Sequence, residues 1–351
     1  MKFSNLRTGM MPVFLAAVLA LLMLAFWFGS CDATETDDSG TAFERPAVTT
    51  PPYERQSIDF FKGITEPGAR DWQEMLRDAG RLLDNGFNTV TLSPPVFITP
   101  RAGGRPRVIL EGEAASAESL IGDFQEKKLA VHVSPTTRAA GFPLSVEPTE
   151  AALGHLEEDA LLWARKAEEH RAELFSPLSG YNQVLGTEAA GQWSSRVLPL
   201  IREEYQGEIG AKVVPDLDGP PEPGQPHDFE ELDYTGYDYL MLDIFPRGES
   251  FDAGDFEAYV TGVLERADAV ARRDGLKGVI VSEFGSWRKP LGAHEADGPV
   301  LAPDEQAQMA ADFLEIAAPR TRGVFYQGWT LPARGARDHP VEEVLKDKFK
   351  D

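Results

Sequence analysis

Carboxylate, amide and aromatic side chains stand at the ends of apolar runs in this sequence. Glu283 follows Val-Ile-Val-Ser directly, and Asp243 lies near the end of the run that begins at Tyr239. Comparable positions after other apolar runs hold Asp216, Asp218, Trp287, Gln327 and Trp329. Carboxylates and amides hydrogen-bond hydroxyl groups, and indole faces pack against apolar surface. Side chains of these types, brought together, would suit a polyhydroxylated ligand.

Each of these carboxylates also has an explanation that involves no chemistry. A carboxylate placed directly after an apolar run is costly to bury, which favours a functional role for Glu283. Asp243 could equally belong to a structural ion pair, for example with Arg247. Asp216 lies beside the sequence 219–221, Gly-Pro-Pro, which is typical of a turn. Glu283 is therefore the principal candidate, and the roles of Asp243 and Asp216 stay open.

The elements that would position these side chains form a repeated pattern. From residue 57 onward, short β-branched or aromatic runs alternate with longer helical patterns, which predicts βα units around a parallel sheet. The predicted strands cover residues 60–65, 88–93, 129–134, 172–176, 210–214, 239–245, 278–284 and 323–329. Eight units in about 290 residues predict an α/β fold of the (β/α)8 TIM-barrel type. In such a barrel the ends of all eight strands meet on one face, where the candidate residues would gather.

An open, doubly wound sheet is the alternative fold. Such sheets carry a Gly-rich phosphate loop after a strand. Gly103 and Gly104 lie in a long segment after the second predicted strand, and no Gly-rich fingerprint follows the others. The barrel is therefore the preferred interpretation.

The N-terminal residues have the layout of a secretory signal. Lys2 and Arg7 precede an apolar run over 12–28, and Gly-Ser-Cys follows at 29–31. This ending resembles the lipobox of bacterial lipoproteins, although Phe28 stands where that motif usually has an aliphatic residue. The resemblance implies a signal peptide over 1–30, cleavage before Cys31 and lipidation of Cys31. An uncleaved membrane anchor is the alternative.

The domain organisation follows from this assignment. Residues 31–56 are rich in Thr, Asp, Pro, Ser and Gly and cannot form a core, so they are predicted to be a flexible linker. Residues 57–351 are predicted to form the barrel. The expected location is extracytoplasmic, periplasmic or at the cell surface, with the membrane as a partner through the N-terminal lipid.

Composition excludes several classes of partner. The formal net charge is -23, from 57 acidic and 34 basic residues, so nucleic acid would be repelled. One cysteine allows no intrachain disulfide. The six histidines are scattered without the spacing of a zinc site, so neither a metal nor another cofactor is expected.

Three short motifs resemble clan A glycoside hydrolases. The sequence 282–287, Ser-Glu-Phe-Gly-Ser-Trp, is similar to the strand that carries the nucleophile in that clan. The strand with Phe325, Tyr326 and Trp329 resembles the strand on which the sugar stacks, and residues 236–246 also fit. The resemblance extends from Phe60 to Trp329. It implies a retaining glycosidase for a β-linked carbohydrate, with Glu283 as nucleophile and Trp329 in the sugar platform. Other expected substrate contacts are Trp287, Tyr181, Asn182, Gln327 and Asp216.

One departure from the clan concerns the acid/base. The clan usually ends its fourth strand with Asn-Glu, whereas this sequence has Ser179-Gly180. A retaining glycosidase needs a second carboxyl group about 5 Å from the nucleophile. Candidates are Glu188, Asp216 and Asp243. Glu188 ranks first because its loop follows the fourth strand, although acids also favour the first turn of a helix.

Two other functions compete with the glycosidase. A barrel that has lost its acid/base would bind carbohydrate without cleaving it, and Ser179-Gly180 favours this alternative. A barrel enzyme of different chemistry, such as a lyase, could use the same acidic rim.

Overall fold

The computed structural model describes most of the chain after residue 52. The described residues are 53–66, 68–96, 105–139, 142–143, 146–215, 229–245, 253–285, 287–288, 300–331 and 335–350. The predicted signal, Cys31 and most of the predicted linker lie outside them, as does Asp216. The proposed domain boundaries therefore stay predictions. Within the described residues, no helix has the length and apolar character needed to cross a membrane.

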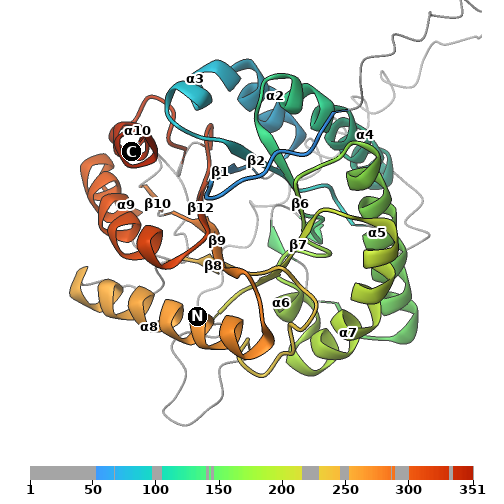
Figure 1. Ribbon diagram of the computed structural model, residues 1–351. Helices are drawn as coiled ribbons and strands as arrows, with labels where there is room; N and C mark the ends of the chain where they lie inside the picture. The colour runs from blue at the N-terminus through green and yellow to red at the C-terminus, as the bar shows by residue number, and fades with distance from the viewer. Residues whose placement is uncertain are drawn as a thin grey trace, which may run out of the picture. The chain divides into compact units, whose positions relative to one another are not determined.

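Eight parallel strands close into a barrel, with helices around it (Figure 1). The strand order is β1-β12-β9-β8-β7-β6-β3-β2. Their bounds are β1 Phe61–Thr65, β2 Thr89–Leu92, β3 Ala130–Val133, β6 Leu174–Phe175, β7 Glu208–Val213, β8 Tyr239–Ile244, β9 Gly278–Phe284 and β12 Gly323–Gln327. The predicted TIM barrel is confirmed. Seven of the eight predicted strand ranges contain their barrel strand, and the range 210–214 overlaps β7, which begins two residues earlier at Glu208.

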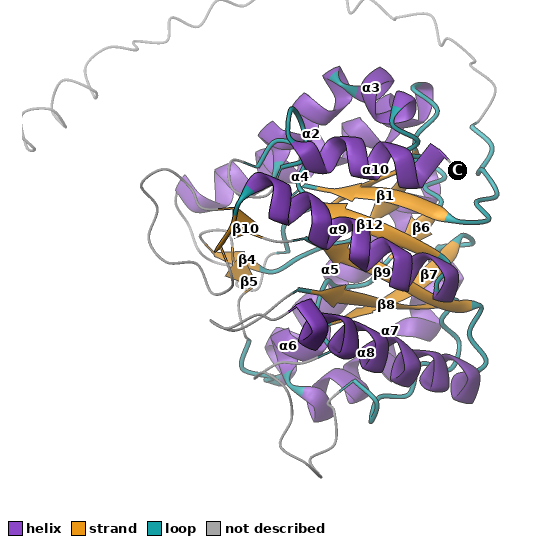
Figure 2. Ribbon diagram, turned by 90° about the vertical axis from the view of Figure 1, so that its left-hand side faces the viewer, coloured by secondary structure: helices purple, strands orange, loops and turns teal. Residues whose placement is uncertain are grey.

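The helices form the outer layer. They are α2 Ala69–Arg77, α3 Ala79–Asp84, α4 Arg105–Glu126, α5 Glu150–Glu169, α6 Tyr181–Leu185, α7 Thr187–Glu204, α8 Ala253–Asp274, α9 Pro303–Ala317 and α10 Pro340–Lys350. A 3-10 turn, η1, covers Ala318–Arg320. Two short strand pairs, β4 Arg138–Ala139 with β5 Phe142–Pro143 and β10 Trp287–Arg288 with β11 Val300–Leu301, follow barrel strands. Figure 2 shows β4, β5 and β10 at the end toward which the barrel strands run.

Side-chain alternation along the strands divides the core into two layers. On β7, Ile209, Ala211 and Val213 belong to the large cluster between strands and helices. The intervening Gly210 and Lys212 therefore face the barrel interior. A smaller interior cluster consists of Phe61, Leu174, Tyr239, Met241, Ile280 and Phe325. Gly210 is required because a Cβ at that position would overlap the side chain of Met241.

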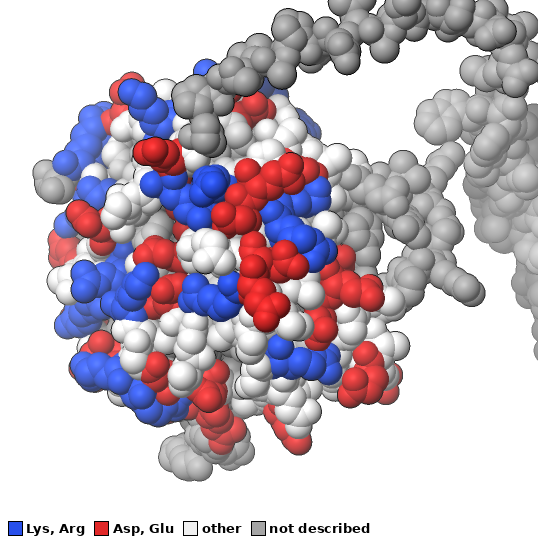
Figure 3. Space-filling model, turned by 45° about the vertical axis from the view of Figure 1, so that its right-hand side comes forward, with Lys and Arg blue, Asp and Glu red and all other residues white. Residues whose placement is uncertain are grey.

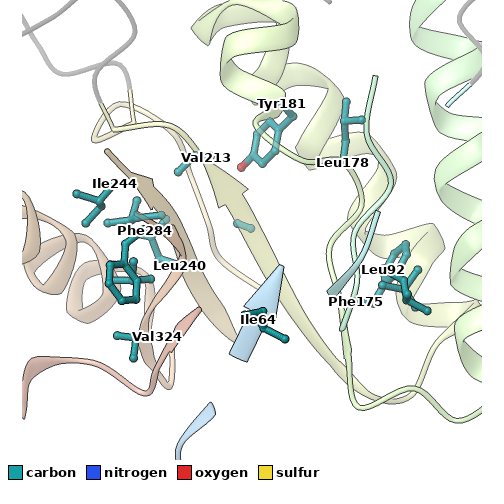
Figure 4. Close-up of a cluster of buried hydrophobic side chains, with 14 of the residues drawn as sticks. Ile64, Leu92, Phe175, Leu178, Tyr181, Val213, Leu240, Ile244, Phe284 and Val324 are labelled. Atoms are coloured by element: carbon teal, nitrogen blue, oxygen red, sulfur yellow. The ribbon is translucent and has the colours of Figure 1, made fainter. Parts of the chain in front are cut away.

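A β-bulge in β9 redirects Glu283. Leu242 of β8 pairs with Val281, but the next residue, Asp243, pairs with Glu283, so Ser282 is an extra residue. Regular alternation would place Glu283 on the same side as Val281, toward the helices. The bulge allows Glu283 to reach the interior. Phe284 then faces outward and packs with Leu240, Ile244 and Val324 (Figure 4), and its ring stacks on Phe313 of α9 at 4.3 Å.

The outer surfaces of the helices carry ion pairs between neighbouring helices. Arg165 of α5 pairs with Glu204 of α7 at 3.2 Å, and Arg196 of α7 pairs with Glu157 of α5 at 2.8 Å. On the face drawn in Figure 3, acidic and basic side chains are interleaved rather than gathered by sign. That face therefore offers no continuous basic area for a phosphate backbone.

Candidate active site

Three charged side chains meet inside the barrel at the carboxyl ends of neighbouring strands. Lys212 comes from β7, Asp243 from β8 and Glu283 from β9. Lys212 Nζ donates to Glu283 Oε1 at 2.6 Å and lies 3.5 Å from Asp243 Oδ1. The lysine side chain has no exposed surface, whereas those of Asp243 and Glu283 are 10% and 12% exposed. These residues are called the Lys212 cluster below.

Neighbouring polar groups fix the two carboxylates. Gln327 Nε2, at the end of β12, donates to Glu283 Oε2 at 2.6 Å. The Ser282 hydroxyl donates to Asp243 Oδ1 at 2.8 Å. Each Glu283 oxygen therefore has a donor, and the extra residue of the bulge supplies a donor to Asp243.

The shared ammonium limits the separation of Asp243 and Glu283. Their nearest oxygens lie 3.5 Å and 2.6 Å from the same Nζ, so these oxygens are at most about 6 Å apart. Carboxyl groups of retaining glycosidases lie about 5–5.5 Å apart, and those of inverting enzymes about 6.5–9.5 Å apart. The geometry is compatible with the retaining arrangement.

Burial changes the proton affinity of Asp243. Burial raises the pKa of Asp243 to about 7; the charge of Lys212 lowers it, and the charge of Glu283 raises it. A carboxyl group with a pKa near neutrality can carry a proton and then release it. Asp243 therefore has the property expected of a general acid.

A neutral histidine borders the Lys212 cluster. Burial lowers the pKa of His132 well below its ordinary value, and the charge of Lys212 lowers it further. Its ring nitrogens contact Thr91 Oγ1 at 3.2 Å and Ser176 Oγ at 2.9 Å. His132 is thus a satisfied interior histidine that adds no second cation next to Lys212.

Glu188, ranked first as acid/base from the sequence, lies elsewhere. It is exposed in the first turn of α7, where it lines a surface cleft with Glu231 and Asp233. Among the described residues it makes none of the hydrogen bonds or ion pairs of the Lys212 cluster. Its position has the ordinary explanation that an acid stabilises a helix N-terminus.

Trp329 does not form a sugar platform, which corrects the expectation from the sequence. Its side chain has no exposed surface. The indole nitrogen donates to Asp78 Oδ2 at 2.7 Å, Phe87 packs edge-on at 6.2 Å, and the Arg81 guanidinium lies over the ring. A ring covered in this way belongs to the packing between β12 and α3, and a ligand has no face to stack on.

Tyr181 and Asn182 are likewise structural in this fold, contrary to their predicted role as substrate contacts. Both are fully buried. Asn182 accepts from the Val214 amide at 3.0 Å and donates to the Val214 carbonyl at 2.7 Å, so it extends β7 as a strand would. Tyr181 packs beside Trp193, and Figure 4 shows its ring among buried side chains. Asn182 thereby fixes the backbone just after Lys212.

The remaining predicted contacts divide into two groups. Gln327 lies in the site and binds Glu283. Asp216 falls outside the described residues, and the Trp287 backbone lies in β10 while its side chain is not described. Glu173 lies just before β6 and accepts a hydrogen bond from Tyr53 at the opposite end of the barrel.

Ser179 and Gly180, which stand where the clan usually has Asn-Glu, have a structural role in the backbone. Ser179 donates its amide to the Pro135 carbonyl, and Gly180 adopts a left-handed conformation with φ of 60° before α6. A glycine tolerates that backbone conformation best. The end of β6 therefore makes a tight connection to α6 and supplies no carboxyl group at 179 and 180.

Lys212 was not recognised from the sequence. A signal existed, because a lysine in the run Glu-Ile-Gly-Ala-Lys-Val alternates with Ile209, Ala211 and Val213 and so must face the interior. The described residues contain no group of three or more histidine, cysteine, aspartate or glutamate side chains that could hold a metal ion.

Comparison with solved structures supports the fold. A GH113 β-1,4-mannanase matches with a TM-score of 0.61 and 14% identity, over 84% of this chain and all of that chain. A GH113 β-mannanase from Alicyclobacillus acidocaldarius matches with a TM-score of 0.61 and 17% identity, over 84% and 98%. A GH5-4 broad-specificity endoglucanase from an uncultured bacterium matches with a TM-score of 0.57 and 11% identity, over 78% and 84%. No protein-family model matches the sequence, and no curated protein sequence does.

Proposed function

We propose that this protein is a retaining glycoside hydrolase for an extracytoplasmic β-linked carbohydrate. Glu283 is the nucleophile, and Asp243, rather than Glu188, is the acid/base. The observation that supports this most directly is the placement of Asp243 and Glu283 around one ammonium, with oxygens at most about 6 Å apart, since the nearest ones lie 3.5 Å and 2.6 Å from it. The fold supports it further, because its structural neighbours include mannanases and an endoglucanase.

The proposed reaction has two steps. Glu283 attacks the anomeric carbon while the Asp243 proton passes to the departing glycosidic oxygen. Water then attacks the glycosyl ester, returns a proton to Asp243 and releases Glu283 as a carboxylate. Gln327 holds the second Glu283 oxygen and so limits rotation of the attacking carboxylate.

The lipid anchor is part of the proposal. Cleavage before Cys31 and its lipidation would tether the barrel to a membrane. Tyr53 and Gln56 hydrogen-bond Glu173 at the beginning of β6, at the end of the barrel opposite Glu283. The first described residues of the chain therefore contact the amino ends of the barrel strands. Replacement of Cys31 by serine should release the protein from membranes into the soluble fraction.

The decisive experiment compares three full-length variants in mild detergent: Glu283→Gln, Asp243→Asn and the control Glu208→Gln, which lies at the opposite end of β7. Substrates are aryl β-glycosides and β-linked oligosaccharides, β-1,4-mannan fragments included. Glu283→Gln should reduce kcat/KM by about a thousandfold or more. Asp243→Asn should impair oligosaccharide cleavage much more than cleavage of activated aryl glycosides, whose leaving groups need no proton.

A carbohydrate-binding protein without activity is the second candidate. The Ser179-Gly180 connection, which leaves no carboxyl group at the end of β6, favours it. If the parent cleaves none of these substrates but still binds oligosaccharides, this second function replaces the first. If Glu283→Gln cleaves as fast as the parent, Glu283 is not the nucleophile.

A further inference from the structure

Lys212 occupies an interior barrel position beside apolar side chains. It lies on β7 in the barrel interior, fully buried, and its pairing neighbour on β8 is Met241. Replacing a buried ion pair with apolar residues is often neutral or stabilising, so a buried lysine between two carboxyls is weak evidence for a stabilising role. Ionisable groups clustered at strand ends of a barrel are instead typical of functional sites.

We propose that Lys212 is a positioning residue that keeps Glu283 ionised for attack and then neutralises Asp243 once Asp243 has lost its proton. This inference rests on the proposed function. Lys212 is not expected to touch the substrate; it acts through the two carboxyls that do.

The charges of the described groups allow Lys212 to balance first Glu283 and then Asp243. Asp243 is faced by Lys212 from β7 and by Glu283 and Ser282 from β9, and Lys212 is also faced by His132 from β3. His132 is neutral, so one cation faces two carboxyl groups. The cluster is neutral when one carboxyl is ionised and the other protonated. Glu283, at 2.6 Å, is the nearer partner of the ammonium in the resting state.

The first chemical step reverses these states without changing the total charge. A bond forms between a Glu283 oxygen and the anomeric carbon, and the bond from that carbon to the leaving oxygen breaks. The Asp243 proton goes to the leaving oxygen. Glu283 is then a neutral ester and Asp243 is an anion, 3.5 Å from Lys212 in the present geometry. The ammonium can balance either state with a small movement, which avoids an unpaired buried charge in the intermediate.

The test uses full-length protein with Lys212→Met, which removes the charge, and Lys212→Arg, which keeps it. Lys277→Met is the matched control. Lys277 also contacts two carboxylates, Glu208 at 3.0 Å and Asp238 at 2.9 Å, but at the opposite end of the same strands.

The first readout needs no substrate. Proteins labelled with ¹³C at aspartate and glutamate carboxyl carbons are titrated by NMR. Lys212→Met should raise the first apparent pKa of the Asp243–Glu283 pair by at least about one pH unit, because the ammonium that stabilises an ionised carboxylate is removed. Lys277→Met should leave that ionisation unchanged. An unchanged titration in Lys212→Met would overturn the inference.

The second readout is the pH dependence of kcat/KM on any substrate that the parent cleaves. Lys212→Met should shift the acidic limb upward by at least about one pH unit and lower kcat about 100-fold, with KM changed only a few-fold. Lys212→Arg should retain the position of the acidic limb. A lower kcat with an unmoved limb in Lys212→Met would show a structural role only and contradict the inference.

Two outcomes are kept distinct by this design. If the parent cleaves nothing, the proposed function fails, while the NMR titration still decides whether Lys212 sets the ionisation of the pair. If Lys212→Met does not fold, Glu283→Gln is compared with the double variant Lys212→Met, Glu283→Gln. Asp243 should titrate at least about one pH unit lower in the variant that keeps Lys212; equal titration would overturn the inference.

Discussion

The two ends of the barrel carry the same combination of charges in different surroundings. At the carboxyl ends of β7, β8 and β9, Lys212 lies between Asp243 and Glu283, and its side chain has no exposed surface. At the beginnings of the same strands, Lys277 lies between Glu208 and Asp238, and 53% of its side chain is exposed. Similar contacts in the two places therefore differ mainly in burial.

That difference changes the protonation of the carboxyls. Around Lys277, burial would raise the pKa of Asp238, but hydrogen bonds from the Ile209 amide, Arg202 and Lys277 outweigh burial and lower this pKa. In the Lys212 cluster, burial raises the pKa of Asp243 to about 7 despite the nearby ammonium. Solvent and several hydrogen-bond donors make the contacts of Lys277 with Glu208 and Asp238 ordinary ion pairs. Exclusion of water instead allows Asp243 in the Lys212 cluster to exchange a proton near neutral pH.

The largest expected contrast is in stability at pH 7. Lys212→Met should lower the free energy of unfolding by about 3–5 kcal/mol, because it leaves a buried carboxylate without its cation. Lys277→Met should cost about 1 kcal/mol or less, since solvent screens the exposed pairs. Urea unfolding of the parent and both variants measures the two costs. Equal costs would show that burial does not separate the two groups.

Glu66 shows what burial does to a carboxyl group for which the described residues show no ion pair. It follows β1 and accepts hydrogen bonds from the Trp329 and Thr330 amides on one oxygen, while the other oxygen has no partner among the described residues. Burial raises its pKa to about 7, although these hydrogen bonds lower it. A folded pKa above the unfolded value means that folding takes up a proton, so stability falls as pH rises from about 4.5 to about 7.

Glu66→Gln should remove that pH dependence. The glutamine oxygen can still accept both amides, and its nitrogen replaces the unpartnered oxygen. The variant should equal the parent near pH 4 and exceed it at pH 8 by on the order of 3 kcal/mol, the equivalent of the shift in pKa. Thermal or urea unfolding across this pH range provides the measurement. A variant with the same pH slope as the parent would assign the slope to other groups.

A smaller effect on stability is expected for the hydrogen bond between Tyr53 and Glu173 at the amino ends of the barrel strands. The Tyr53 hydroxyl donates to Glu173 Oε1 at 2.5 Å, and Glu173 Oε2 accepts from the Val131 amide at 2.8 Å. Tyr53→Phe should lower the free energy of unfolding by about 1–2 kcal/mol, with no effect on substrate cleavage. A loss of catalysis in this variant would contradict the assignment of this hydrogen bond to stability alone.

The smallest contrast is in sensitivity to salt. In 1 M NaCl the Debye length is about 3 Å, so the exposed pairs of Lys277 are screened and the buried pairs of Lys212 are not. The stability difference between parent and Lys277→Met should shrink by a few tenths of a kcal/mol. The difference for Lys212→Met should stay the same. Repeating the urea titrations at low and high salt tests this, and a salt-sensitive Lys212 difference would indicate that water reaches the cluster.

Local pattern was enough to predict the barrel and the strand-end position of two acidic residues. Strand identity depends on β-branched runs and turn residues that are close in sequence, so the eight strands and the places of Asp243 and Glu283 could be predicted.

Tertiary structure alone decided which of these groups meet. The bulge at Ser282 depends on pairing with β8, and without it regular alternation would turn Glu283 toward the helices. Trp329 is covered by Phe87 and Asp78, which lie about 250 residues earlier in the chain. Lys212 meets Glu283 across 71 residues. Such contacts depend on register and packing between distant segments, and a single sequence shows only the alternation of side chains within each segment.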